Sequence, residues 1–142
     1  MAKRPIKFRA WDGKKMLFTD KGQFYLMNNG TIDIPSSTGH EFYNKNYPVM
    51  QFTGLHDRNG KEIYEGDILC NEEYDAWEWR GVVKFSHGVF GAEWLSNVES
   101  QSMVGSWGQK HNLRKLDDDI LERQVVVGNI YENPELLTQQ TP

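Results

Sequence analysis

The chain alternates between short apolar runs and turn residues, a pattern typical of an all-β protein. The first strictly alternating run, residues 6–11, predicts a strand that opens an antiparallel meander within about the first 35 residues. Turns at Asp12-Gly13, Asp20–Gly22 and Asn28–Gly30 would separate its strands. Alternation gives the first strand two faces, one with Ile6, Phe8 and Ala10 and the other with Lys7, Arg9 and Trp11.

The middle of the chain predicts a linker and then a second domain. Residues 35–47 are poor in aliphatic side chains, which favours a loop. We therefore expect an N-terminal meander with its linker over residues 1–48 and a second domain over residues 49–142. Residues 77–85 alternate with a period of two and predict a strand, which a two-residue turn at His87-Gly88 joins to its partner.

The C-terminal third adds weaker signals. Residues 113–121 fit a short helix, although a strand and turn fit almost as well. A strong strand is predicted at Val125–Val127, and Gly128 marks a candidate bulge. Asn133 suits a helix cap and Pro134 a first helical position, which predicts a short C-terminal helical turn. The expected fold is mainly β.

Composition supports a folded protein inside a cell. Of the 142 residues, 38% are hydrophobic, and five Trp, six Tyr and seven Phe can fill a small core. The only cysteine, Cys70, cannot form an internal disulfide and is expected to be a buried apolar residue. No apolar run approaches the roughly 18 residues of a membrane span, and charged residues interrupt any signal-peptide core.

Charge is divided unevenly along the chain. Residues 1–15 hold six Lys/Arg and one Asp, a net charge of +5, whereas residues 16–142 hold ten Lys/Arg and nineteen Asp/Glu, a net charge of −9. The acidic body argues against wrapping double-stranded nucleic acid over a large surface. The basic start is expected to be an edge strand with outward charges, or else an arm that contacts an acidic partner.

Three segments taken together, residues 6–12, 50–68 and 127–137, resemble the YopX family of phage and prophage proteins. They lie at the start, middle and end, so the resemblance spans nearly the whole chain. It implies a small β-rich protein encoded in phage genomes, with an SH3-like β-barrel in its C-terminal part. It implies no activity and no catalytic residue.

The motif residues of these segments have a structural interpretation. Their glycines fall where turns or bulges need backbone freedom, and their aspartates are placed to accept backbone N–H groups in turns. The residues concerned are Gly54, Asp57, Gly60, Gly66, Asp67 and Gly128.

No pattern in the sequence predicts catalysis or metal binding. The four histidines are scattered without ligand spacing. Asp57–Gly60 faintly resembles the start of a calcium loop, but Ile68 would occupy the twelfth position. Asp117–Asp119 is read as a solvated acidic turn, and no nucleophile or phosphate-binding motif is present. We therefore expect no metal, no cofactor and no small-molecule substrate, and an enzyme is only a third hypothesis.

The leading hypothesis is a non-catalytic binding module in the host cytoplasm. Its partner would be a protein, with a second copy of the chain as one alternative. Trp77, Trp79 and Trp107 are the candidate contacts, although the alternation of Trp77 and Trp79 equally fits a place in the core. Trp107, between two glycines, is the better candidate if it is exposed.

Nucleic-acid binding is the alternative. The cations at the N-terminus would contact phosphates, and Trp11 would stack on a base; these cations are Lys3, Arg4, Lys7 and Arg9. This hypothesis requires those side chains to line one groove.

Overall fold

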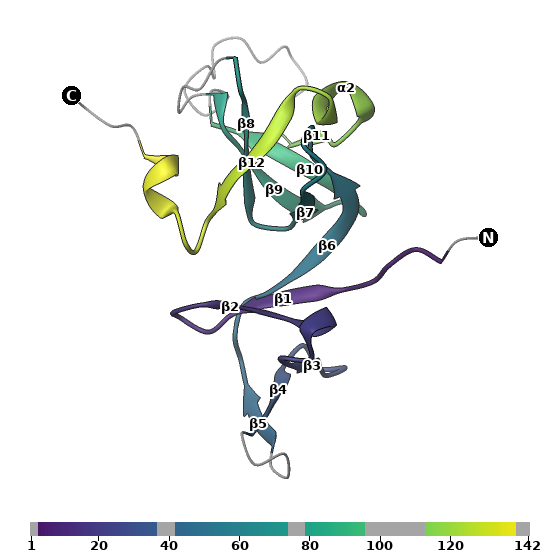
Figure 1. The fold of residues 1–142 in the computed structure, drawn as a ribbon, viewed down its shortest axis with the longest axis vertical. Coiled ribbons are helices and arrows are strands. Elements are labelled where there is room, and N and C mark those ends of the chain that lie inside the picture. Colours follow the sequence, from purple (N-terminus) through teal and green to yellow (C-terminus); the bar gives the residue numbers. More distant parts are fainter. Residues whose placement is uncertain (1–2, 37–41, 74–78, 96–112, 139–142) are drawn as a thin grey trace. The chain divides into compact units, whose positions relative to one another are not determined.

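The computed structural model shows antiparallel β-sheets with a few short helical turns (Figure 1). Strands far outnumber helical turns among the described residues, which confirms the mainly β prediction. The chain divides into two compact units, unit 1 (Met1–Gly54) and unit 2 (Leu55–Pro142). The predicted domain division after residue 48 stays a prediction. The structure describes residues 3–36, 42–73, 79–95 and 113–138.

Unit 1 contains strands at all the positions predicted for the N-terminal meander. They are distributed over two sheets, one in which β1 lies between β2 and β6, and one with the order β3-β4-β5. The elements are β1 (Phe8–Trp11), β2 (Met16–Phe18), the 3-10 turn η1 (Thr19–Lys21), β3 (Tyr25–Leu26), β4 (Ile32–Pro35), β5 (Phe42–Lys45) and β6 (Val49–His56), whose last two residues belong to unit 2.

Two sequence predictions for unit 1 are wrong. The basic strand β1 is not an edge strand, because Arg9 pairs with Phe18 of β2 on one side and with Met50 of β6 on the other. The segment 35–47 is not only a loop, because β5 lies within it and pairs with β4. Both errors arise from pairing between strands, which local composition does not report.

The core of unit 1 confirms most of the predicted faces of β1. Ala10 is fully buried, and Phe8 packs against the same cluster. Ile6, predicted on that face, is 66% exposed because it precedes the paired part of the strand. The buried members of this core are Ala10, Leu17, Phe24 and Ile32.

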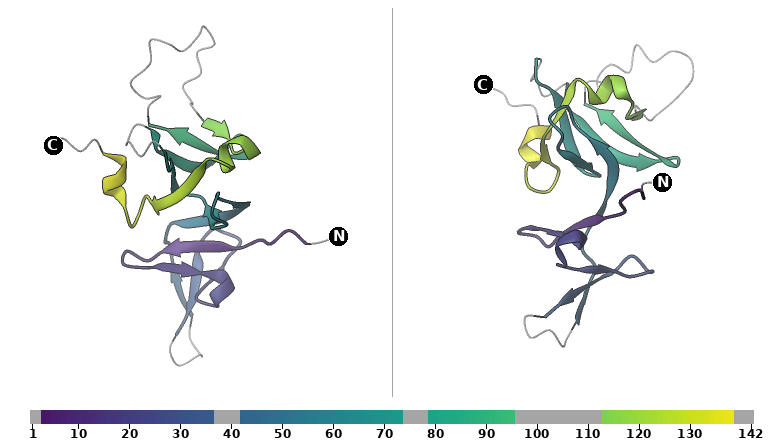
Figure 2. Two further views of the ribbon diagram at one scale, coloured as in Figure 1. Left: turned by 45° about the horizontal axis from the view of Figure 1, so that its top comes forward. Right: turned by 45° about the vertical axis from the view of Figure 1, so that its right-hand side comes forward.

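Unit 2 is a curled five-stranded antiparallel sheet with the order β11-β10-β9-β8-β12 (Figure 2), which is consistent with the predicted SH3-like barrel. Its short elements include both alternatives weighed for residues 113–121, a strand and a helical turn. The elements are β7 (Glu62–Tyr64), β8 (Asp67–Asn71), β9 (Gly81–Ser86), β10 (Val89–Trp94), β11 (Leu113–Lys115), α2 (Asp118–Leu121), β12 (Gln124–Asn129) and the 3-10 turn η3 (Pro134–Leu137).

The interior of unit 2 is apolar and draws on most of its elements. Its buried cluster consists of Ile63, Leu69, Val83, Ala92, Leu116 and Ile120. Cys70 is 1% exposed, as predicted. The predicted strand 77–85 begins only at Gly81, where a Cβ would lie 2.6 Å from the ring of Trp94. Within the described ranges, no helix is long and apolar enough to cross a membrane.

Candidate functional site

The motif residue Asp57 organises the turn that follows β6. Its Oδ1 accepts the backbone N–H groups of Asn59 and Lys61, each at 2.9 Å, and its Oδ2 accepts that of Val126 in β12, also at 2.9 Å. The residue is only 7% exposed. Asp57 therefore closes a turn and ties it to an edge strand of the sheet, which confirms the predicted role as a backbone acceptor.

The second motif aspartate, Asp67, likewise accepts a backbone N–H group, in the turn between β7 and β8. Asp67 is 2% exposed, and its Oδ2 accepts the N–H of Tyr64 at 2.8 Å. Gly66, with φ of 83°, supplies the left-handed turn between them. Its carbonyl accepts the N–H of Ile130 at 2.9 Å, so this turn also holds the end of β12.

The third motif shapes the exit from β12. The register shifts at Gly128, which confirms the predicted bulge. Asn129 accepts the N–H groups of Tyr131 and Glu132 on its Oδ1, at 3.0 and 2.9 Å. Asn133 holds the N-cap position of η3, as predicted, but its side chain makes no capping bond there; its Oδ1 accepts the N–H of Asn129 at 3.2 Å instead. These polar groups are bound to backbone and shape the fold.

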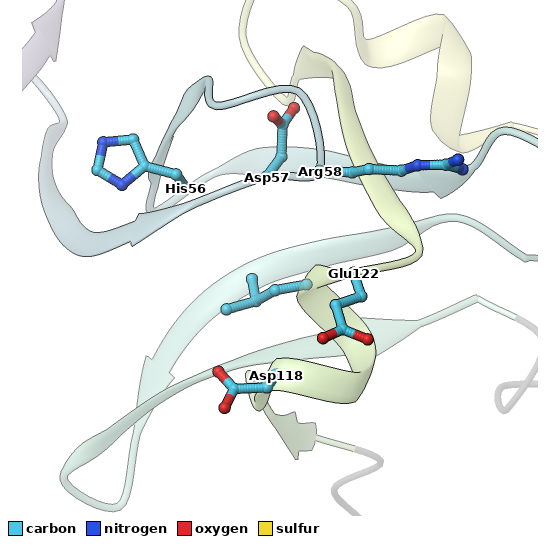
Figure 3. A pocket seen from close by; sticks show the side chains of 6 residues that line it. His56, Asp57, Arg58, Asp118 and Glu122 are labelled. Atoms are coloured by element: carbon cyan, nitrogen blue, oxygen red, sulfur yellow. The ribbon is translucent and has the colours of Figure 1, made fainter.

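A shallow pocket lies between the turn after β6 and helix α2 (Figure 3). It has a volume of about 330 Å³ and a largely charged wall. In Figure 3, Asp118 and Glu122 extend from α2 on one side, and the other labelled residues lie on the opposite segment. The lining residues are His56, Asp57, Arg58, Asp118, Leu121 and Glu122.

The charges around this pocket are only partly balanced. Arg58 is paired with Glu72 at 3.6 Å, and Arg123 is paired with Asp119 at 3.0 Å. Asp117 caps α2 by accepting the N–H of Ile120 at 3.0 Å. The sequence indicated an acidic turn at 117–119, but not its place opposite the turn that follows β6. Groups of His, Cys, Asp and Glu that could hold a metal ion are absent from the described residues.

The side chains predicted to form a basic surface on the N-terminal strand are not all exposed. Arg9 is 6% exposed and lies in an interior strand. Lys7 pairs with Asp20 at 3.7 Å, and its ammonium lies 4.8 Å from the centroid of the Phe52 ring. Arg4 is exposed and Trp11 is half-buried. The burial of Arg9 contradicts its prediction as a nucleic-acid contact, because a phosphate cannot reach a side chain enclosed within the fold.

The predicted aromatic contacts have different outcomes. Trp79 is 55% exposed, so the alternative that placed it in the core is wrong and it stays a candidate contact. Trp77 and Trp107 lie outside the described residues.

The sequence missed a second exposed aromatic group, at the tip of the β9–β10 hairpin. Phe85 is 54% exposed and packs on Phe90 of the opposite strand, with ring centroids 5.0 Å apart. The turn between them has φ of 53° at His87 and 81° at Gly88, which confirms the predicted two-residue turn. Phe85 shares its face with the buried Val83, so alternation alone assigns it to the core; its exposure follows from its place at the end of the hairpin.

Fold and site together define a class: a two-unit, mainly β protein whose motif residues build turns and which displays aromatic side chains at its surface. The family model described as YopX protein matches residues 7–138. The chain belongs to the YopX family, as the resemblance predicted.

Two solved structures are similar to it. EF1440 from Enterococcus faecalis has 32% sequence identity and a TM-score of 0.53, over 96% of this chain and 100% of that one. YopX from Bacillus subtilis has 22% identity and a TM-score of 0.56, over 93% and 98% of the two chains. Among proteins with curated descriptions, none matches this chain.

Proposed function

We propose that this protein is a non-catalytic protein-binding module, encoded by a phage or prophage and acting in the cytoplasm of its bacterial host. The observation that carries the proposal is the exposure of Phe85 at the tip of an ordered hairpin. Rigid aromatic side chains that stand out from a surface are the usual anchors of protein interfaces, because they bury much area and lose little conformational entropy on binding.

The hairpin presents Phe85 in a fixed arrangement. The β9–β10 strands pair over their full length. Lys84 and Glu93 form an ion pair at 2.8 Å on the face opposite Phe85. Val89, also on that opposite face, is 38% exposed, so the tip offers apolar surface on both sides. A partner with an apolar groove could enclose the Phe85 and Val89 side chains at this tip.

The motif residues support the non-catalytic part of the proposal. In Asp57, Asp67 and Asn129, side-chain oxygens accept backbone N–H groups of turns. A general acid or base must exchange protons with a substrate, and a carboxylate occupied by the backbone is badly placed for that. The residues that identify the family thus build its fold.

The test compares three versions of the protein as bait in extracts of bacterial cells. We expect the wild type and the control Val127→Thr to retain a common set of proteins, and Phe85→Ser to lose at least one of them. Val127 is the matched control because it is also exposed, at 40%, but lies on β12. A retained protein is then purified, and its dissociation constant should rise by roughly tenfold or more with Phe85→Ser. A set of retained proteins that does not depend on Phe85 would refute the proposal.

Nucleic-acid binding stays a weaker alternative, because only Lys3 and Arg4 of the four cations predicted for it are exposed. Fluorescence-polarisation titrations with labelled single-stranded DNA test it. Salt-sensitive binding that Arg4→Glu abolishes would favour this alternative over the protein-binding proposal.

A further inference from the structure

The pocket described above, here called the acidic pocket, carries negative charge that its surroundings do not balance. It is lined by His56, Asp57, Arg58, Asp118, Leu121 and Glu122. Asp118 begins α2 and Glu122 is its C-cap, so these two exposed carboxylates lie about one helical turn apart and repel each other. The neighbouring arginines are already engaged, Arg58 with Glu72 and Arg123 with Asp119. Leu121 adds an apolar part to the pocket wall. Such a pocket fits a cationic side chain with an aliphatic stem, as in lysine.

Unit 1 presents lysines of this kind on a rigid support. The β1–β2 turn projects from the rest of its sheet (Figures 1 and 2). Asp12 accepts the N–H groups of Lys14 and Lys15 on Oδ1, at 2.7 and 2.8 Å, which fixes the turn. Both lysine side chains are exposed, and neither ammonium is paired with a carboxylate among the described residues. We call residues 12–15 the basic turn.

The two units carry opposite net charges. Residues 1–54 hold eight Lys/Arg and four Asp/Glu, a net charge of +4, whereas residues 55–142 hold eight Lys/Arg and sixteen Asp/Glu, a net charge of −8. Copies of this chain therefore attract one another when unit 1 of one copy faces unit 2 of another, and they repel when like units face.

We propose that the basic turn of one copy docks in the acidic pocket of a second copy, so that the protein associates head to tail. Lys14 and Lys15 supply the cations, Asp118 and Glu122 receive them, and Leu121 contacts the aliphatic stems. Because the two contacting surfaces differ, the contact repeats from copy to copy and produces rings or open chains. This inference extends the proposed binding role to a second surface, distinct from the Phe85 hairpin.

Sedimentation velocity over a range of protein concentrations tests the proposal at low salt and at about 0.15 M salt, where the Debye length is about 8 Å. We expect the wild type to form larger species as its concentration rises at low salt, and fewer of them at the higher salt. The variants Asp118→Lys/Glu122→Lys and Lys14→Glu/Lys15→Glu should each weaken association by roughly tenfold or more. Circular dichroism confirms folding, which these exposed positions should not disturb.

Two matched controls separate local pairing from net charge. Glu132→Lys/Glu135→Lys changes the net charge as the pocket variant does, and Arg114→Glu/Lys115→Glu changes it as the turn variant does; all four positions are exposed. Both control variants should associate like the wild type.

The decisive experiment mixes the two swapped variants. In the pocket variant both surfaces are basic, and in the turn variant both are acidic, so neither variant can associate with itself. In the mixture, each basic surface of the pocket variant can pair with an acidic surface of the turn variant. Association restored only in the mixture supports the proposal. A wild type that is monomeric at every concentration and salt, controls that fail as the swaps do, or a mixture that stays monomeric would each overturn it. Phe85→Ser should associate normally, so failure here leaves the hairpin proposal untouched.

Discussion

Replacing Asp57 by alanine should destabilise unit 2 more than its position in a surface turn suggests. The carboxylate accepts three backbone N–H groups, two within its own turn and one from Val126 of β12. A second bond, from the N–H of Arg58 to the carbonyl of Gln124 at 3.1 Å, depends on the same turn geometry. The substitution therefore loosens both the turn and its attachment to the edge strand.

The magnitude follows from what replaces each lost bond. Asn59 and Lys61 are exposed, so water can hydrate their amides, and each loss costs about 0.5–1 kcal/mol. Val126 is half-buried and loses a charged acceptor, which costs about 1.5–3 kcal/mol. We expect Asp57→Ala to lower the free energy of unfolding of unit 2 by about 3 kcal/mol, a large part of the roughly 5–15 kcal/mol of an ordinary domain.

Asp57→Asn provides an internal check on this reasoning. Asparagine keeps an acceptor oxygen for the turn amides, but its NH2 group then faces the donor of Val126. It should recover the turn bonds only, at a cost of about 2 kcal/mol.

Urea unfolding followed by circular dichroism measures these changes, with hydrogen exchange of the β12 amides to locate them. Asp118→Ala is the matched control, because that exposed side chain holds no backbone group, and its effect should stay within about 0.5 kcal/mol. An Asp57→Ala protein as stable as this control would refute the account of Asp57.

Three further predictions concern the bulge, the basic turn and the exposed tryptophan. Gly128→Ala should destabilise unit 2 by about 1–3 kcal/mol in urea, because its Cβ would lie 2.5 Å from Oδ1 of Asn133; a neutral effect would contradict the packing. The backbone N–H of Lys15, and to a smaller extent that of Lys14, lowers the pKa of Asp12 below its ordinary 3.8. The Asp12 carboxylate therefore contributes its full stabilisation above pH 3.8 and loses it as the pH falls through its lowered pKa. An NMR titration of this carboxyl checks the prediction, and a pKa at or above 3.8 would contradict it. Trp79→Ala should change the thermal unfolding midpoint little, since the side chain is 55% exposed; a large drop would place it in the packing.

The sequence by itself determined the local structure of this protein. The two-residue turn at His87-Gly88, the bulge at Gly128, the acceptor role of Asp57 and the C-terminal helical turn were all predictable. Each depends on backbone conformations that residues close in sequence impose, such as a positive φ or a side chain that reaches a nearby amide. Several of these residues, among them Asp57 and Gly128, lie in the segments that resemble the YopX family.

The tertiary structure alone decided which side chains are available for binding. The sequence predicts Arg9 as an exposed charge, but β1 pairs with β2 and β6, and Arg9 is buried. Phe85 reads as core, but the hairpin carries it beyond the residues that would cover it. Asp118 is exposed, as predicted, but only the fold makes it line a pocket together with a turn some sixty residues earlier in the chain. Exposure and pocket formation depend on the pairing of segments far apart in sequence, and a local pattern holds no record of that pairing.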